Sequence, residues 1–258
     1  MILAILQARF SSSRFRGKVL KPILGVPMLA LQIERIKRAK LIDYLLVATS
    51  KDVTDDAIEN LCININVGCY RGNLEDVLDR FYQAAKLYSP EHIVRLTGDC
   101  PLADPELIDE VIKFYLTGDF DYASNALEPT YPDGLDVEIC RFKCLEQAWK
   151  EAKLPSQREH VTPFINQQPH LFHIGVYKNN TNLSHLRWTV DEQLDFNLIA
   201  NIYEALYRNN PKFTTQDILD FLEVNSYLKD FNTCYQRNEG LQKSLLVDEL
   251  FLNKIGED

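Results

Sequence analysis

Continuous apolar runs alternate with amphipathic stretches through the first half of the chain. We predict buried strands from the apolar runs, at residues 2–6, 44–49, 63–67 and 92–96. We predict helices where apolar residues recur at helical spacing, at residues 28–39, 54–61, 74–87 and 105–116. This alternation predicts an α/β fold, with a mostly parallel sheet, right-handed crossovers and helices on both faces.

The pattern becomes less regular after Gly118. We predict further strands at residues 121–124, 134–141, 172–178 and 186–190. We predict further helices at residues 143–152, 157–166, 191–207 and 215–222. Residues 125–185 are interpreted as a lobe inserted into the sheet, suited to a lid or a dimer face. The chain is therefore expected to form one domain at 1–225, with a polar tail at 226–258 that packs on the domain or extends it.

Composition and charge exclude several classes of protein. The chain has 258 residues, a net charge of −9 and 46% hydrophobic residues. An acidic protein lacks the basic surface that nonspecific nucleic-acid binding needs, so we expect no nucleic-acid partner. No apolar run approaches the roughly 20 residues of a membrane span, so we expect no membrane partner. The six cysteines form no Cys-x-x-Cys pair, which favours free thiols and a cytoplasmic location.

The residues after the first strand concentrate positive charge in this acidic chain. Five cations lie close together with no acidic residue among them: Arg9, Arg14, Arg16, Lys18 and Lys21. Backbone N–H groups and fixed positive charge in a short loop suit a triphosphate. Open α/β sheets also bind their ligands at the carboxyl ends of the strands, where this loop begins. A solvated basic loop is the alternative, and charge alone does not decide between the two.

Two aspartates follow predicted strands at distant points of the chain. Asp99 comes just after the strand at 92–96, and Asp191 directly follows the strand at 186–190. Mg²⁺ takes one or two carboxylates together with phosphate oxygens, so two acids that face a basic loop predict a magnesium site. The alternatives are structural, since Asp99 would cap a turn and Asp191 would be the N-cap of the next helix.

Several motifs in order resemble the cytidylyltransferases that activate acidic sugars, most closely the branch typified by the spore coat polysaccharide biosynthesis protein SpsF. The matching motifs are Gln7-Ala8-Arg9, Ser13-Arg14, Gly17-Lys18-Val19-Leu20, Gly25-x-Pro27-Met28-Leu29, Arg71-Gly72, Thr97-Gly98-Asp99-Cys100-Pro101-Leu102, Gly134-Leu135-Asp136-Val137-Glu138, Arg158-Glu159-His160-Val161-Thr162 and Arg187-Trp188-Thr189-Val190-Asp191. The resemblance implies the nucleotide-diphospho-sugar transferase fold, a Rossmann-like and GT-A-like three-layer sandwich. It also implies that CTP and an acidic sugar react to give a CMP-sugar and pyrophosphate.

The resemblance also implies roles for the matching positions. The implied catalytic residues are Lys18, Arg14 and Asp99, and the implied Mg²⁺ ligands are Asp99 and Asp191. The implied nucleotide-binding residues are Ala8, Arg9, Ser13, Arg14, Lys18, Thr49, Arg71 and Gly98. The implied sugar-binding residues are Asp136, Glu138, Arg187 and His160, with a structural hydrogen-bonding role as the alternative for His160. The implied partners are CTP, an anionic small-molecule acceptor and a second copy of the chain in a homodimer.

The chain departs from the family pattern in its first loop, and the acceptor stays open. Phe15-Arg16 stands where many relatives have Leu-Pro, which frees the loop and adds a charge. A polyol phosphate or sugar phosphate acceptor would instead give a CDP-linked product. A glycosyltransferase of the same general fold is a further alternative, although Asp99-Cys100-Pro101 stands where that class usually carries Asp-x-Asp. A sugar-nucleotide-binding protein without activity is the non-enzymatic alternative.

Overall fold

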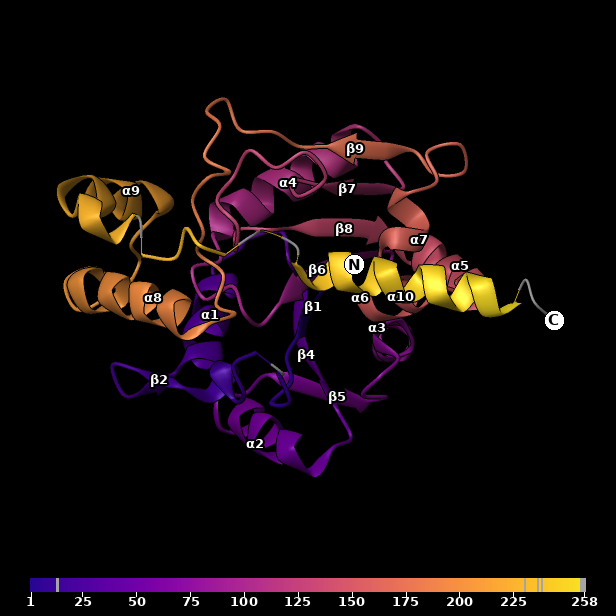
Figure 1. The fold of residues 1–258 in the computed structure, drawn as a ribbon, viewed down its shortest axis with the longest axis horizontal. Helices are drawn as coiled ribbons and strands as arrows, with labels where there is room; N and C mark the ends of the chain where they lie inside the picture. The colour runs from indigo at the N-terminus through magenta and orange to yellow at the C-terminus, as the bar shows by residue number, and fades with distance from the viewer. Residues whose placement is uncertain (13, 230, 236, 238, 256–258) are drawn as a thin grey trace.

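One mixed sheet forms the centre of the protein (Figure 1). A computed structural model describes residues 1–12, 14–229, 231–235, 237 and 239–255. Within these residues the sheet has seven strands, in the order β5-β4-β1-β6-β8-β7-β9. The strands are β1 (Ile2–Gln7), β4 (Tyr44–Ser50), β5 (Gly68–Gly72), β6 (His92–Thr97), β7 (Tyr122–Ser124), β8 (Glu138–Arg141) and β9 (Ile174–Val176). A separate antiparallel pair consists of β2 (Pro22–Ile23) and β3 (Val26–Pro27).

Most neighbouring strands of the sheet are parallel. β1 pairs in parallel with β4 and β6, β4 with β5, and β7 with β9, whereas β8 is antiparallel to both of its neighbours. The predicted α/β class with a mostly parallel, mixed sheet is confirmed. Because β1, β4 and β6 are parallel, their carboxyl ends meet at one edge of the sheet, and ligands bind at such edges.

Helices cover both faces of the sheet. They are α1 (Met28–Ile36), α2 (Asp56–Asn64), α3 (Val77–Lys86), α4 (Pro105–Thr117), α5 (Phe142–Glu151), α6 (Pro155–His160), α7 (Pro163–Asn166), α8 (Gln193–Leu206), α9 (Thr215–Val224) and α10 (Glu239–Ile255). Short 3-10 turns occur at Lys18–Leu20, Val53–Asp55 and Ser226–Leu228.

Alternate residues of β1 enter two different hydrophobic cores. Ala4 and Leu6 belong to the core that also holds apolar residues of α1, α2, α4, α8 and α9. Leu3 and Ile5 belong to the core formed with α3, α5 and α7. Successive side chains of a strand point to opposite faces, so a central strand covered on both sides is apolar throughout. The continuous apolar run at 2–6 is thus the signature of a three-layer arrangement.

The strand predicted at 63–67 is wrong, because α2 extends to Asn64 and β5 begins only at Gly68. α2 buries Ile58 and Cys62, which are four residues apart on one helix face, and leaves Ile63 exposed. Burial of this face decides in favour of helix over the short apolar run.

The strand predicted at 186–190 is also wrong. Among the described residues, this segment makes one isolated bridge, from Arg187 to Asp133. Its backbone instead bonds to loops, since the Val190 N–H donates to the carbonyl of Asp99 at 2.7 Å. The segment is extended because it follows these loops rather than the sheet.

The helix predicted at 157–166 is divided into α6 and α7. Val161 lies between them with a φ of 74°, and Pro163 begins α7. Residues 125–185, interpreted as an inserted lobe, supply β8 and β9 to the main sheet.

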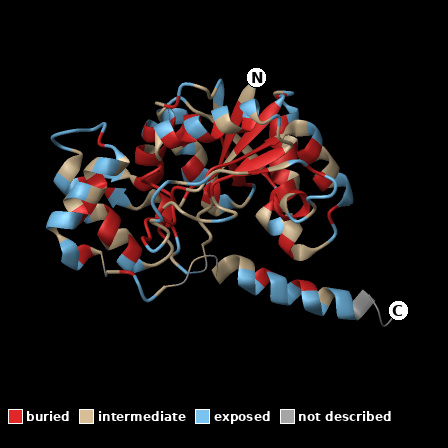
Figure 2. Cartoon of the chain, turned by 90° about the horizontal axis from the view of Figure 1, so that it is seen from above, coloured by how far each residue is buried: buried red, intermediate tan, exposed pale blue. Residues whose placement is uncertain are grey.

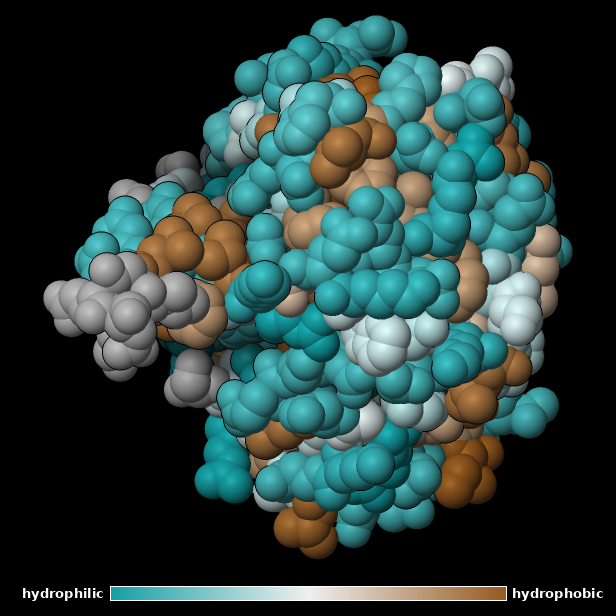
Figure 3. Space-filling model, turned by 90° about the vertical axis from the view of Figure 1, so that its right-hand side faces the viewer, coloured by the Kyte–Doolittle hydropathy of each residue, from teal (hydrophilic) through white to brown (hydrophobic). Residues whose placement is uncertain are grey.

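Much of the tail predicted to be polar is the long helix α10, which lies beside α6 and projects from the body of the protein (Figures 1 and 2). Its exposed apolar residues are Leu245, Leu246, Val247, Leu250 and Leu252. Figure 3 shows hydrophobic side chains on this projecting part. None of the described helices is both long and apolar enough to cross a membrane.

Candidate active site

Two adjoining cavities lie beside the carboxyl ends of β1 and β6. The first has a volume of about 430 Å³ and the second about 290 Å³. Both are lined by Arg14, Arg95, Thr97, Asp99, His160, Asp191 and Gly240. These shared residues mark a junction, where molecules bound in the two cavities would meet.

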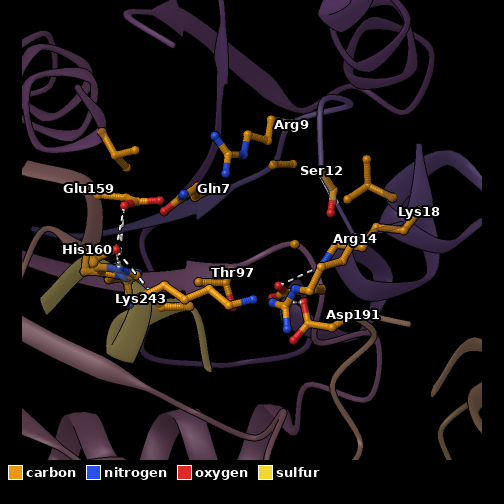
Figure 4. A pocket seen from close by; sticks show the side chains of 18 of the residues that line it. Gln7, Arg9, Ser12, Arg14, Lys18, Thr97, Glu159, His160, Asp191 and Lys243 are labelled. Atoms are coloured by element: carbon orange, nitrogen blue, oxygen red, sulfur yellow. Dashed lines mark hydrogen bonds and ion pairs between the residues drawn. The ribbon is translucent and has the colours of Figure 1, made fainter. Parts of the chain in front are cut away.

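The basic loop after β1 folds back so that three of its five cations line the first cavity (Figure 4). The Gly17 N–H closes the loop by donating to the carbonyl of Phe10 at 2.9 Å. Gly17 has a φ of 72°, and a Cβ at this position would lie 2.8 Å from the Phe10 ring, so the turn requires glycine. The turn brings Arg9, Arg14 and Lys18 to one cavity, as the sequence predicts.

Lys18 joins the two aspartates that follow predicted strands. Its ammonium donates to Asp191 Oδ1 at 2.9 Å and to Asp99 Oδ2 at 3.1 Å, and the residue is only 7% exposed. Burial alone would lower the pKa of Lys18, but the two carboxylates raise it above its ordinary value. Burial also opposes ionisation of Asp99, yet Lys18 holds the pKa of Asp99 well below its ordinary range. The three groups therefore form one charged cluster at the junction.

Backbone hydrogen bonds bring Asp191 to this position. The Val190 N–H donates to the carbonyl of Asp99 at 2.7 Å, and the Trp188 N–H donates to the carbonyl of Asp133 at 2.6 Å. Trp188 is buried in the main core, which anchors the segment between these two bonds. The spacing of the aspartates is thus set by backbone pairing as well as by Lys18.

Gly134 allows this segment to approach closely. It has a φ of 105°, and a Cβ at this position would lie 2.4 Å from the backbone nitrogen of Thr189. Any other residue would push apart the two loops that hold Asp133 and Asp191. The glycine of the Gly134-Leu135-Asp136 motif therefore has a packing role.

Arg187 supports Asp191 from the buried side of the cluster. Its guanidinium donates to Asp195 at 2.9 Å, to Asp133 at 3.0 Å and to Asp191 at 3.2 Å. Burial opposes the charge, but these carboxylates raise the pKa of Arg187 above its ordinary value. Arg187 lines neither cavity, so the structure replaces the predicted sugar contact with a positioning role.

Glu138 orders one wall of the second cavity. Its carboxylate accepts hydrogen bonds from the hydroxyls of Tyr122 and Thr162, both at 2.6 Å, and forms an ion pair with Arg95 of β6. Burial opposes the charge of Arg95, but Glu138 raises the pKa of the guanidinium. With three donors to satisfy it, Glu138 fixes Arg95 at the junction of the cavities.

Asp133 and Asp136 lie on the second cavity and share one cation. Arg237 forms an ion pair with Asp136 and lies 3.8 Å from Asp133 Oδ1. Burial raises the pKa of Asp136 to about 7, although Arg237 acts in the opposite direction. Burial also raises the pKa of Asp133. The predicted sugar-binding position of Asp136 is therefore on the cavity wall, and its charge changes near neutral pH.

His160 lines both cavities and also has the structural role that we gave as its alternative. Its Nε2 lies 2.9 Å from the hydroxyl oxygen of Ser244, which in turn donates to Glu159 Oε2 at 2.7 Å. Burial lowers the pKa of His160, so the ring is mainly neutral at pH 7.

Of the remaining predicted nucleotide-binding residues that the structure describes, two line the first cavity and two line neither cavity. Ala8 and Gly98 line the first cavity, and a Cβ on Gly98 would lie 3.0 Å from that of Ala8. Thr49 is fully buried and lines neither cavity. Arg71 also lies away from both cavities, because it pairs with acids of α2, Asp56 at 2.6 Å among them. Ser13 lies outside the described residues.

The predictions from the sequence missed Arg95, Asp133 and the residues of α10 that line the cavities. A signal existed for Arg95, which is the one cation in a strand that is otherwise mostly apolar. Asp133 stands next to the glycine of a matched motif. No site role was predicted for α10, because its place beside the site depends on tertiary packing.

The residues at the junction fit the predicted Mg²⁺. Asp99 and Asp191 offer oxygen ligands, and both carboxylates already converge on a single cation, the ammonium of Lys18. Among the described residues no cluster of three or more potential metal ligands occurs. Mg²⁺ needs none, since it completes its shell with phosphate oxygens and water.

Comparison with known proteins identifies relatives over most of the chain. The family described as "Cytidylyltransferase" matches residues 3–238. The uncharacterized protein MJ1063 of Methanocaldococcus jannaschii is 39% identical over 90% of this chain and 94% of its own length. The spore coat polysaccharide biosynthesis protein SpsF of Bacillus subtilis is 32% identical, over 87% of this chain and 95% of its own.

Solved structures show the same fold. A cytidylyltransferase from Leptospira borgpetersenii superposes with a TM-score of 0.85 at 29% identity, covering 91% of this chain and 99% of its own. The synthetase of CMP-2-keto-3-deoxy-manno-octonic acid, solved with CTP, superposes with a TM-score of 0.61 at 15% identity, covering 79% of this chain and 98% of its own.

Proposed function

This chain belongs to the cytidylyltransferase family and is a nucleotidyltransferase, and from that premise we propose that it transfers the cytidylyl group of CTP to a hydroxyl of an acidic sugar. The observation that carries the proposal is the position of the Lys18, Asp99 and Asp191 cluster. It lies where the two cavities meet, and we assign the first cavity to the nucleotide and the second to the acceptor.

The reaction joins a sugar hydroxyl oxygen to the α-phosphorus of CTP and breaks the bond from that phosphorus to the β-phosphate oxygen. The products are a CMP-sugar and pyrophosphate, and the hydroxyl proton passes to solvent. Such a transfer needs positioning and charge neutralisation more than covalent catalysis. Arg14 at the junction and Lys18 beside it on the first cavity supply fixed positive charge where negative charge would develop. Mg²⁺ held by Asp99 and Asp191 would add Lewis-acid stabilisation of the phosphates.

The chemistry of the second cavity supports an acidic sugar as the acceptor. Asp133 and Asp136 offer carboxylate oxygens that accept hydrogen bonds from sugar hydroxyls. Arg14 and Arg95 each pair with a protein carboxylate, but a guanidinium has five N–H donors, so both retain donors that suit a sugar carboxylate. The names of two relatives point the same way, because one is named for spore coat polysaccharide biosynthesis and another for a 2-keto-3-deoxy sugar acid.

Pyrophosphate release tests the proposal. The protein is mixed with CTP, Mg²⁺ and a panel of acidic sugars, polyol phosphates and sugar phosphates, and the product is identified by mass. We expect release with an acidic sugar and a product that contains one phosphate. A CDP-linked product would show that the acceptor is a phosphate and would contradict the acidic sugar. Absence of pyrophosphate with every acceptor, together with cleavage of a finished nucleotide sugar, would contradict nucleotidyl transfer.

The homodimer and the cytoplasmic location stay predictions. A dimer through residues 125–185 would sediment at twice the mass of the chain. A single monomeric species at micromolar concentration would contradict it.

A further inference from the structure

The first turns of α10 form part of the wall of both cavities. Gly240, Lys243, Ser244 and Val247 line the first cavity, and the second includes Glu239. The family match covers residues 3–238, and α10 begins at the next residue, Glu239.

Buried polar contacts fasten α10 against α6. Ser244 contacts Glu159 and His160, as described above. One turn further on, both oxygens of the Asp248 carboxylate accept hydrogen bonds from Ser156, one of them from its N–H at 2.9 Å. Ser244 and Asp248 are four residues apart and buried, so one face of the helix is docked and the positions beside it are fixed.

α10 is also tied to the basic loop. Arg14 of that loop forms an ion pair with Asp191 at 2.8 Å and lies 3.8 Å from Glu239 at the start of the helix. The beginning of α10 therefore lies against the loop that is proposed to bind phosphates.

Lys243 extends from this docked turn into the first cavity, toward Thr97 and Arg14 (Figure 4). The cations Lys18, Arg14 and Arg95 on the same cavity all have carboxylate partners. The side chain of Lys243 makes no hydrogen bond or ion pair with any residue that the structure describes, and the same holds for the side chain of Arg9. A cation that faces a cavity without a protein partner leaves its charge for a bound anion.

We propose that Lys243 binds the β- and γ-phosphates of CTP, so that α10 completes the nucleotide site on the side opposite Arg9. This inference rests on the proposed function, and it adds Lys243 to the residues that bind the triphosphate. Lys243 lines the first cavity but not the second, which assigns it to the triphosphate rather than to the acceptor. Lysine recognises phosphate as a point charge, so its effect should follow the charge of the ligand.

Calorimetric titration with CTP and with CMP, both in Mg²⁺, tests the proposal. We expect Lys243→Met to weaken CTP binding roughly tenfold, to leave CMP binding unchanged, and to lose less affinity as salt is added. Lys243→Arg should restore most of the CTP affinity. Lys113→Met is the matched control, because Lys113 is an exposed lysine of α4 that lines neither cavity. Equal thermal melting of the free proteins would show that the fold is intact.

Two failures can be told apart. If the unsubstituted protein does not bind CTP, the proposed function fails. If it binds CTP and Lys243→Met binds CTP equally well, this inference alone is overturned. Unchanged CTP affinity with a raised KM for the acceptor would also overturn it, since Lys243 would then bind the acceptor carboxylate.

Discussion

The ammonium of Lys18 lies 2.9 Å from a carboxylate oxygen of Asp191, although the two residues are 173 positions apart in the chain. The same ammonium reaches Asp99, so three segments of the chain converge at one charged point. A buried cation between two carboxylates is stable only while all three groups stay paired. Substrate phosphates and Mg²⁺ would therefore enter a site where the opposing charges are already placed.

Removal of the Lys18 charge is expected to abolish turnover. Lys18→Met should lower kcat at least ~100-fold, because it removes a fixed cation from the point where charge develops on the phosphates. The measurement is pyrophosphate release with the acceptor that the panel identifies. Lys21→Met is the control in the same loop, since Lys21 lies over the Phe15 ring and lines neither cavity. Near-normal kcat in Lys18→Met would remove Lys18 from the chemistry.

Gly134 should tolerate no side chain. In Gly134→Ala the added Cβ would meet the Thr189 backbone, so we expect a loss of about 3 kcal/mol in the free energy of unfolding and reduced activity. Gly25→Ala is the comparison, because Gly25 also has a positive φ but nothing lies within 4 Å of the point that its Cβ would occupy. Gly25→Ala should lower the free energy of unfolding by about 1 kcal/mol and leave kcat unchanged. Urea unfolding measures both, and equal losses would contradict the steric explanation.

Arg187 should matter for folding as much as for activity. Arg187→Met leaves the buried carboxylates of Asp133 and Asp195 and the partly buried Asp191 without their shared cation, so we expect a loss of about 3 kcal/mol or more in the free energy of unfolding. Arg187→Lys keeps the charge but cannot reach all three acids. We expect it to lower the free energy of unfolding by less than Arg187→Met does. Denaturant titration of both variants is the measurement. A stability close to that of the unsubstituted protein in Arg187→Met would refute the positioning role.

Asp136 is expected to give the stability of the protein a specific pH dependence. Its pKa of about 7 in the folded protein lies above the value of about 3.9 in an unfolded chain, so the folded state binds the proton more tightly. This contribution to stability is fully present below about pH 4 and is lost as the pH rises through about 7. Asp136→Asn should remove it. Between about pH 4 and 7 the free energy of unfolding of the unsubstituted protein should therefore fall relative to that of the variant. A difference between the two free energies that stays constant over this range would count against the raised pKa.

Much of the fold could be predicted from local pattern. The run at 2–6 predicts a central strand, because a strand covered on both faces has no polar side. The errors arose where pattern and packing disagree. Ile63 completes an apolar run but is exposed on α2, and the segment at 186–190 is extended without entering the sheet.

Within the site, the residues predicted best are those whose position follows directly from a strand end. Asp99 follows β6, and the basic loop follows β1, so parallel pairing of these strands brings both to one edge. Arg71 lies near the carboxyl end of β5, but its long side chain pairs with acids of α2 and does not line either cavity. Strand order fixes where a Cα lies, whereas local charge decides where a flexible side chain points.

The α/β class, the cationic loop and Asp99 could be inferred from the residue pattern, since they depend on periodicity and on residues close to strand ends. Asp191 was inferred from a strand at 186–190 that the structure does not contain, and backbone bonds of an extended loop bring it to the site. The support of Asp191 by Arg187 and the closure of the cavity by α10 with Lys243 became visible only in the folded chain. Both depend on contacts between segments that are far apart in the chain, and the direction of a side chain there is set by the partners that packing provides.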